Sequence, residues 1–277
     1  MCISSNGENH NLGEKMKILC TSDLHMQHKH ERVIDKLREL VAQQKPDVLV
    51  IAGDIVESSW HNCNVYKLLS IAFPDTTVIF VLGNHEFFYC TVEETRGFYE
   101  RTYKPNKYDV HCLDVVGHYD VEGVRFVGNV LFYDGSMKSD SNQNLSKFAD
   151  GRWADRTIKN FDWEEECRLN IARIKDNLPG PEDEIKTTIL VTHCVPHVKL
   201  NTHTMSQFNA YSGVDNLFDR LSPKLGIGSH GIDWAVCGHT HRRSVGLRLN
   251  GCNCVNVGND YYWNTLRVES YLIELPD

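Results

Sequence analysis

The stretch TVIFVLGNHE, residues 77–86, joins an apolar run typical of a buried strand to a group of polar side chains. Gly83 ends the run, and Asn84, His85 and Glu86 follow it. An apolar run of this length, rich in β-branched residues and closed by glycine, predicts a strand of a largely parallel sheet. Three side chains able to bind a cation or transfer a proton would then lie directly after that strand.

Four other apolar runs end in the same way. They are KILCTSDLH at residues 17–25, DVLVIAGD at 47–54, TILVTH at 188–193 and WAVCGHTH at 234–241. In an open α/β sheet the carboxyl ends of the strands face one crevice, so these polar residues should converge although they lie far apart in sequence. Asp23 and His25, on a backbone expected to be extended, should point to the same side, as should His239 and His241. Carboxylate, amide oxygen and imidazole are ligands that suit manganese, iron or zinc.

Apolar runs alternate with amphipathic stretches along the chain, which is the pattern of α/β proteins. The runs predict strands at residues 17–21, 47–52, 77–82, 110–116, 119–121, 124–127, 188–192 and 234–237. Three antiparallel strands are predicted to close the chain at 244–249, 252–257 and 267–275. Amphipathic periodicity predicts helices at residues 31–43, 65–72 and 163–176. Glu122-Gly123 is a predicted hairpin turn.

Two long polar segments interrupt this alternation, at residues 131–161 and 196–216. Loops longer than about 12 to 15 residues are usually functional or disordered, so both segments are candidate covers of an active site. The alternative is a surface excursion packed by its own side chains. With a flexible polar tail at residues 1–15, the sequence predicts one domain at 16–277 with insertions at about 131–161 and 196–216.

The composition is that of an ordinary globular protein, with 41% hydrophobic and 24% charged residues. No apolar run approaches the roughly 18 to 20 residues needed to cross a bilayer. Ten cysteines are scattered without zinc-finger spacing, and the N-terminal stretch does not resemble a secretory signal, so we expect reduced thiols and a cytoplasmic protein. The net charge of −8 argues against nucleic acid as a partner without excluding it.

The order of these motifs resembles the calcineurin-like metallophosphoesterase family, whose pattern is D-x-H, G-D, G-N-H-[DE], H and G-H-x-H. Every element is present in order, and the resemblance spans residue 16 to about residue 275. It implies a four-layer α/β/β/α sandwich with two mixed sheets. It also implies a centre of two divalent or mixed-valence ions, Mn, Fe or Zn. The implied ligands are Asp23, His25 and His241 for one ion, Asn84, His193 and His239 for the other, and Asp54 as the bridge.

The implied activity is hydrolysis of a phosphoester by a hydroxide bridging two ions, which lower the pKa of the water that attacks. His85 matches the catalytic histidine of the family, and in its protonated form it would stabilise phosphoryl charge or protonate the leaving group. Glu86 either orients a ligand or serves as a structural or solvated carboxylate, and the second interpretation is favoured.

Two relatives are disfavoured by the second motif. Protein Ser/Thr phosphatases continue it with Asp-Arg-Gly, whereas Ile55 and Val56 follow here, and purple acid phosphatases need a tyrosine where this chain has Glu57. The expected substrate is therefore a small phosphomonoester or phosphodiester such as a nucleotide. The alternatives are a metal-dependent nuclease of the same family and a non-catalytic scaffold on the same fold.

The first long segment is predicted to supply substrate contacts. Arginine pairs with phosphate bidentately and tryptophan offers a stacking face, so Arg152, Trp153 and Arg156 are the candidates, with His28 from the loop after the first motif. No membrane partner is expected, and no pattern indicates an oligomeric state.

Overall fold

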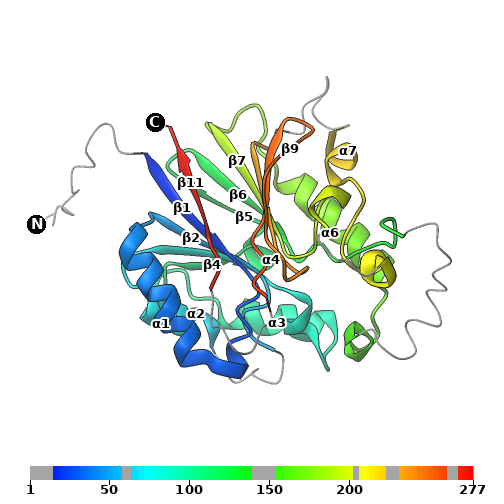
Figure 1. The fold of residues 1–277 in the computed structure, drawn as a ribbon, viewed down its shortest axis with the longest axis horizontal. Helices are drawn as coiled ribbons and strands as arrows, with labels where there is room; N and C mark the ends of the chain where they lie inside the picture. Colours follow the sequence, from blue (N-terminus) through cyan, green and yellow to red (C-terminus); the bar gives the residue numbers. More distant parts are fainter. Residues whose placement is uncertain are drawn as a thin grey trace, which may run out of the picture.

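The structure is a computed structural model that describes residues 15–57, 64–138, 154–201, 206–222, 231–260 and 268–276. The side chains of residues 28–30 and 206–207 are outside this description. The chain forms two mixed sheets packed face to face, with helices on their outer faces, as expected for the sandwich (Figure 1).

The first sheet holds four parallel strands and one antiparallel edge strand. In order these strands are β11 (Tyr271–Leu275), β1 (Met16–Thr21), β2 (Val48–Ala52), β3 (Thr77–Val81) and β4 (Val110–Cys112). The C-terminal strand β11 thus returns to lie beside the N-terminal strand β1, which Figure 1 shows in red and blue.

The second sheet has a parallel centre and an antiparallel strand at each edge. Its order is β5 (His118–Val121), β6 (Val124–Asn129), β7 (Thr187–Thr192), β8 (Trp234–Cys237), β10 (Cys252–Asn256) and β9 (Ser244–Leu249). The predicted hairpin is confirmed, because Glu122 and Gly123 join β5 to β6 with φ values of 48° and 79°. The three closing strands are confirmed in part: β9 and β11 are antiparallel to their neighbours, whereas β10 also pairs with β8 in parallel.

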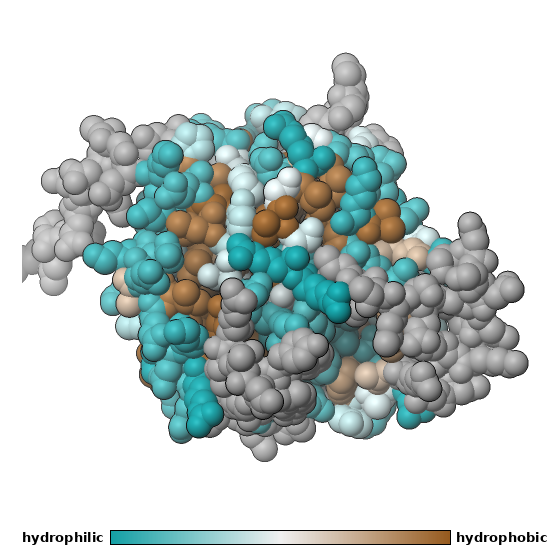
Figure 2. Space-filling view, in the orientation of Figure 1, coloured by the Kyte–Doolittle hydropathy of each residue, from teal (hydrophilic) through white to brown (hydrophobic). Residues whose placement is uncertain are grey.

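Strand residues alternate between two environments. In β1, Ile18 and Cys20 belong to the apolar core between the sheets, while Leu19 belongs to the core under the helices. Successive side chains of a strand point to opposite faces, so a strand buried on both faces alternates between the two cores. Figure 2 shows hydrophilic residues over most of the visible face and hydrophobic patches near β1 and β9.

The helices are α1 (Met26–Gln44), α2 (Val65–Ala72), α3 (Val92–Thr102), α4 (Leu113–Val116), α6 (Trp163–Asn177) and α7 (Leu217–Leu221). Short 3-10 helices are η2 (Asn84–Phe87), η3 (Ala154–Thr157), η4 (Val198–Leu200) and η5 (Ser206–Tyr211). In Figure 1, α1 and α2 lie on the left of the sheets and α6 and α7 on the right. No helix in the described ranges is long and apolar enough to span a membrane.

The predicted strand at residues 110–116 is wrong in its second half. The strand ends at Cys112, and Leu113–Val116 forms the helical turn α4, which Gly117 ends at φ 84°. A short apolar run does not distinguish a strand from a buried helical turn. Asp114 selects the helix, because its buried carboxylate accepts hydrogen bonds from Leu82 N and Val130 N.

Two helices also differ from their predictions. α1 begins at Met26, before the predicted start at residue 31, so His28 belongs to a helix and not to a loop. α3 was not predicted, although Thr91 and Glu94 form the reciprocal hydrogen bonds of a capping box at its start.

Candidate metal centre

The predicted convergence of the five strand ends is confirmed. β1, β2 and β3 of one sheet and β7 and β8 of the other end at the same place, and backbone hydrogen bonds tie their loops together. Asp23 N donates to Gly53 O, His25 N to Asp54 O, and Gly238 N to His193 O, all at 3.0 Å. The site therefore lies where the carboxyl ends of these five strands, from both sheets, meet.

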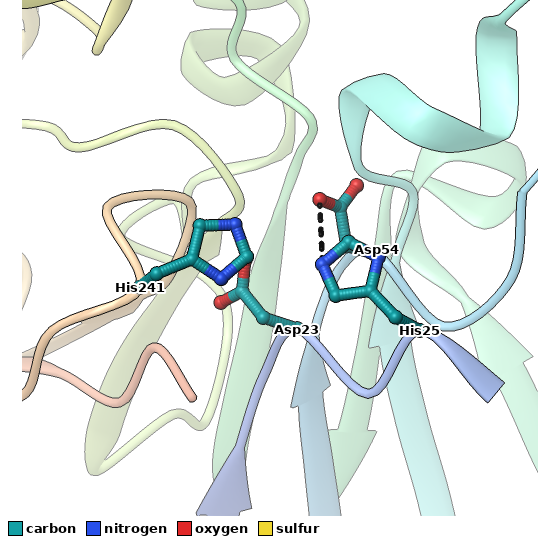
Figure 3. A group of neighbouring side chains, drawn as sticks. All are labelled: Asp23, His25, Asp54 and His241. Carbon is teal, nitrogen blue, oxygen red and sulfur yellow. Dashed lines mark ion pairs between the residues drawn. The ribbon is translucent and has the colours of Figure 1, made fainter. Parts of the chain in front are cut away.

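Asp23, His25, Asp54 and His241 form one group of possible ligands, whose ligand atoms all lie within 4.8 Å of one another (Figure 3). Nε2 of His25 lies 3.6 Å from Oδ2 of Asp54, and Nε2 of His241 lies 3.6 Å from Oδ1 of Asp23. Two carboxylates and two imidazoles at this spacing could hold one cation.

Asn84, His193 and His239 form a second group around the same carboxylate. Oδ1 of Asn84 lies 3.0 Å from Nε2 of His193 and 3.1 Å from Nδ1 of His239, and these two ring nitrogens are 3.2 Å apart. Oδ2 of Asp54 is 3.4 Å from Nε2 of His193. Atoms bound to one ion at about 2.0 to 2.2 Å lie about 3.0 to 3.5 Å from each other, so this second group also has the spacing of a coordination shell.

The outer contacts of the histidines aim lone pairs into these groups. His193 has Nδ1 2.8 Å from Ala52 O, His239 has Nε2 3.0 Å from Tyr211 O, and His241 has Nδ1 2.8 Å from Asn259 O. A neutral imidazole that donates one N–H to a carbonyl presents the lone pair of its other nitrogen. Without a cation, a proton on one of the two nitrogens joins Nε2 of His193 to Nδ1 of His239. A bound cation would displace this proton and meet the lone pairs of both nitrogens.

Five of the seven predicted ligands have left-handed backbone conformations. They are Asp23 (φ 55°), His25 (φ 41°), Asp54 (φ 52°), His239 (φ 69°) and His241 (φ 51°). The expectation that residues 23 to 25 and 239 to 241 are extended is therefore wrong, although each pair does reach the same site. Left-handed residues other than glycine cost on the order of 1 to 3 kcal/mol each and cluster at functional sites. The backbone is held in these conformations by the cross-loop hydrogen bonds.

The glycines of the motifs leave room for ligand side chains. A Cβ on Gly83 would overlap Asp54 Oδ1, and one on Gly238 would overlap Ser22 Oγ and lie 2.6 Å from Asp23 Oδ2. Gly53 has φ 88°, and a Cβ there would lie 2.5 Å from Nδ1 of His193. Each motif glycine is thus needed because a candidate ligand occupies the space beside it.

His85 lies at the open side of the site, with 19% of its side chain exposed. Its backbone N–H donates to Asp54 Oδ1 at 3.1 Å, and its Nε2 lies 3.8 Å from Asp54 Oδ2. Glu86 is buried and accepts from Val56 N at 2.8 Å and Gly83 N at 2.6 Å. Glu86 therefore acts as a structural carboxylate, the favoured of its two interpretations.

The electrostatics of the site depend on Asp54. Burial raises the pKa of this carboxyl, but the neighbouring His193 and His85 outweigh burial and hold the pKa well below its usual value. Burial lowers the pKa of His193, but the carboxylates of Asp54 and Asp23 raise it to about 10. Burial likewise lowers the pKa of His25. An anionic carboxylate enclosed by imidazoles is the environment that attracts a cation.

Both long segments reach the second ligand group through contacts that no motif indicated. Asp155 of η3 accepts a hydrogen bond from Asn84 Nδ2 at 2.7 Å, and Tyr211 of η5 contacts His239 through its carbonyl. Arg220 of α7 pairs with Asp134 and with Asp215, one residue from each segment. The described parts of these segments therefore lie against the site and against each other.

Of the four residues predicted to contact the substrate, the structure describes the side chain of one. Arg156 is exposed on η3, next to the buried Asp155. Arg152 and Trp153 fall outside the described residues, and so does the side chain of His28. The role of all four in substrate binding stays a prediction.

Relatives found by sequence are metallophosphoesterases. An uncharacterized metallophosphoesterase of Campylobacter jejuni is 33% identical over 81 residues, which cover 28% of this chain and 22% of that protein. Another, of Aquifex aeolicus, is 31% identical over 78 residues, which cover 27% of this chain and 30% of that protein. The matched segments thus span less than a third of either relative.

Solved structures share the fold. Phosphopantetheinyl hydrolase from Mycobacterium tuberculosis has a TM-score of 0.72 at 18% identity, covering 96% of this chain and 98% of its own. A dimetal phosphatase from Danio rerio has a TM-score of 0.52 at 13% identity, covering 95% and 94%. The profile of the calcineurin-like phosphoesterase family matches residues 16–243. This chain therefore belongs to the calcineurin-like phosphoesterase family of metal-dependent hydrolases.

Proposed function

We propose that this protein is a dinuclear metal-dependent hydrolase of small phosphoesters. The observation that carries the proposal is the position of Asp54 Oδ2, which lies 3.6 Å from His25 Nε2 in one ligand group and 3.4 Å from His193 Nε2 in the other. One carboxylate oxygen shared by two groups is the arrangement that a pair of ions about 3.5 to 4 Å apart needs.

The residues fit a pair of Mn, Fe or Zn ions. Asp23, His25 and His241 would hold one ion, Asn84, His193 and His239 the other, and Asp54 would contact both. Two such ions supply Lewis acidity to the phosphoryl oxygens and a water of lowered pKa. The candidate ligands are carboxylate and amide oxygens, which suit Mn, and imidazole nitrogens, which suit Fe and Zn.

His85 would act on the substrate. Its backbone N–H fixes Asp54 Oδ1, and its ring lies against Phe88 and His25 with centroids 4.4 and 4.7 Å away. This packing limits the orientation of the imidazole at the open side of the site. In its protonated form it would neutralise phosphoryl charge or protonate the leaving oxygen.

The substrate class is supported by the charge of the chain and by the segments beside the site. A net charge of −8 disfavours a polyanionic polymer, whereas an exposed Arg156 near the site could meet one phosphoryl group. A nucleotide or another small phosphoester is therefore the proposed substrate, either as a monoester or as a diester. The similar Mycobacterium tuberculosis structure adds phosphopantetheine esters to the compounds to be tested.

The test is a hydrolysis screen of the purified protein with Mn, Fe, Zn and Mg added separately, alongside elemental analysis of bound metal. We expect cleavage of nitrophenyl phosphate and of bis-nitrophenyl phosphate, both abolished by chelator and restored by manganese. Protein that holds two ions but cleaves no tested ester would favour a scaffold on the same fold. Cleavage of single-stranded DNA in preference to small esters would favour the nuclease alternative. Fractionation of cells tests the proposed cytoplasmic location separately.

A further inference from the structure

The carboxamide of Asn84 must be held in one of two orientations. Its Oδ1 faces His193 and His239, where a second ion would lie, and its Nδ2 faces away. Rotation of the amide by half a turn would place two N–H donors where a cation needs an oxygen. The side chain cannot exclude this rotation by itself, because the two ends of an amide have nearly the same shape.

Asp155 fixes this orientation. Its Oδ1 accepts from Asn84 Nδ2 at 2.7 Å, and its side chain is 3% exposed, so water does not replace the contact freely. Both oxygens of Asp155 act as acceptors, so Oδ1 selects the NH₂ end of the Asn84 amide and rejects the oxygen end.

Tyr133 in turn holds Asp155. Its hydroxyl donates to Asp155 Oδ2 at 2.7 Å. Asp155 therefore accepts from Asn84 at Oδ1 and from Tyr133 at Oδ2. The Tyr133 side chain is fully buried, with its ring centroid 5.4 Å from that of Tyr211 and 5.8 Å from that of Trp163. A buried phenol without a partner would be costly, so the hydroxyl and the carboxylate stabilise each other.

The backbone before Tyr133 is strained. Leu131 and Phe132 have φ values of 67° and 48°, which are rare for large side chains. Such strain is unfavourable and persists only where surrounding contacts impose it. Phe132 packs against Phe87 and Phe161, with ring centroids 5.2 and 4.7 Å away. The chain thus turns sharply after β6 at the point that brings the Tyr133 hydroxyl to Asp155.

We propose that Asp155, held by Tyr133, is a positioning residue that fixes Asn84 as an oxygen ligand of the second ion. Through this pair the described parts of the first long segment, residues 131–138 and 154–161, control how tightly the centre holds that ion. The inference rests on the two-metal function proposed above. Asn84 differs here from His193, His239 and His241, whose outer contacts go to backbone carbonyls, so its support can be removed by substitution.

The test measures Mn²⁺ binding by titration calorimetry and by electron paramagnetic resonance, in which a coupled pair of ions and a single ion give different spectra. Removal of an outer partner of a ligand typically weakens metal binding about 10- to 100-fold. We expect Asp155→Ala to weaken the second binding step by that factor, leave the first step unchanged and lose the coupled spectrum. Asp155→Asn keeps one oxygen acceptor and should weaken the second step less. Tyr133→Phe keeps the ring packing and should fall between Asp155→Asn and the unchanged protein.

Two control variants separate positioning from general loss of stability. Asp114→Asn changes another buried carboxylate with two hydrogen-bond donors, and Tyr66→Phe changes another buried tyrosine, packed in α2 against Phe80 with ring centroids 5.6 Å apart. Both should keep two ions at the affinity of the unchanged protein even if they melt at lower temperature.

Three results would overturn the inference. The first is that Asp155→Ala, Asp155→Asn and Tyr133→Phe all bind two ions as tightly as the unchanged protein. The second is equal weakening in the Asp114 and Tyr66 controls, which would make the effect one of stability. In both cases the proposed function would stand if the unchanged protein binds two ions. If the unchanged protein itself binds only one, the two-metal function and this inference fail together.

Discussion

Oδ2 of Asp54 lies 3.4 Å from Nε2 of His193, and this contact joins the two halves of the site. Asp54 follows a strand of one sheet and His193 follows a strand of the other. The same oxygen lies 3.6 Å from His25 Nε2, which belongs to the first ligand group. Because Asp54 is only 1% exposed, its charge has to be balanced by the groups around it.

We expect Asp54→Asn and Asp54→Ala to be the most damaging changes of any candidate ligand. A shared carboxylate neutralises two cations, so its loss should release at least one ion and reduce hydrolysis to background. Elemental analysis of the folded variant tests this, with Asp35→Asn on the exposed face of α1 as a control that should keep both ions. Two retained ions together with full activity would rule out the shared role of Asp54.

His85→Asn should separate metal binding from catalysis. We expect the variant to retain its ions, because no predicted ligand contact is removed, while kcat falls by about 10²- to 10⁴-fold, as is typical for loss of a general acid or base. The loss should be larger for an alkyl ester than for a nitrophenyl ester, since a poor leaving group depends more on protonation. Loss of metal by this variant, or unchanged turnover of the alkyl ester, would contradict the assignment.

Gly238→Ala should weaken metal binding although it removes no ligand atom. The added Cβ would overlap Ser22 Oγ and lie 2.6 Å from Asp23 Oδ2, so it would displace the carboxylate of a first-group ligand. We expect Mn²⁺ affinity to fall at least about tenfold, by analogy with loss of an outer contact. Gly180→Ala is the matched control, because its Cβ would meet Asp183 Oδ2 at an ordinary 3.8 Å. Equal affinity in the two variants would show that the site tolerates the displacement.

The strands and the polar residues that follow them could be predicted because each is local in sequence, whereas the sandwich and the assignment of ligands to two ions came from the resemblance to the family. An apolar run followed by a polar residue marks a strand end wherever it occurs, and parallel packing then brings Asp23, Asn84, His193 and His239 together. The positions of β1, β2, β3, β7 and β8 follow from such runs to within a residue or two.

The remainder could not be predicted because it depends on tertiary contacts. The left-handed conformations of Asp23 and His25 are imposed by hydrogen bonds from another loop, and strand periodicity contains no sign of them. Asp155 lies 71 residues from Asn84 in the sequence, within a segment that contains many other polar side chains. The sequence directed attention to this segment as a candidate cover of the active site, but its motifs gave no reason to select Asp155.

Asp114 provides the last prediction, which concerns stability. Its buried carboxylate accepts from Leu82 N at 2.7 Å, just after β3, and from Val130 N at 3.1 Å, just after β6, so it joins the ends of strands from the two sheets. Asp114→Ala would leave two buried N–H groups unsatisfied, and each costs about 1 to 3 kcal/mol. We expect the free energy of unfolding to fall by about 2 to 6 kcal/mol, whereas Asp114→Asn keeps one acceptor and should lose about half as much. Urea denaturation measures both values.

Because Asp114 contacts no candidate ligand, ion content should remain unchanged in the folded variants. A loss below about 0.5 kcal/mol for Asp114→Ala would mean that water or a local shift satisfies the two donors, and that this contact does not hold the sheet ends together.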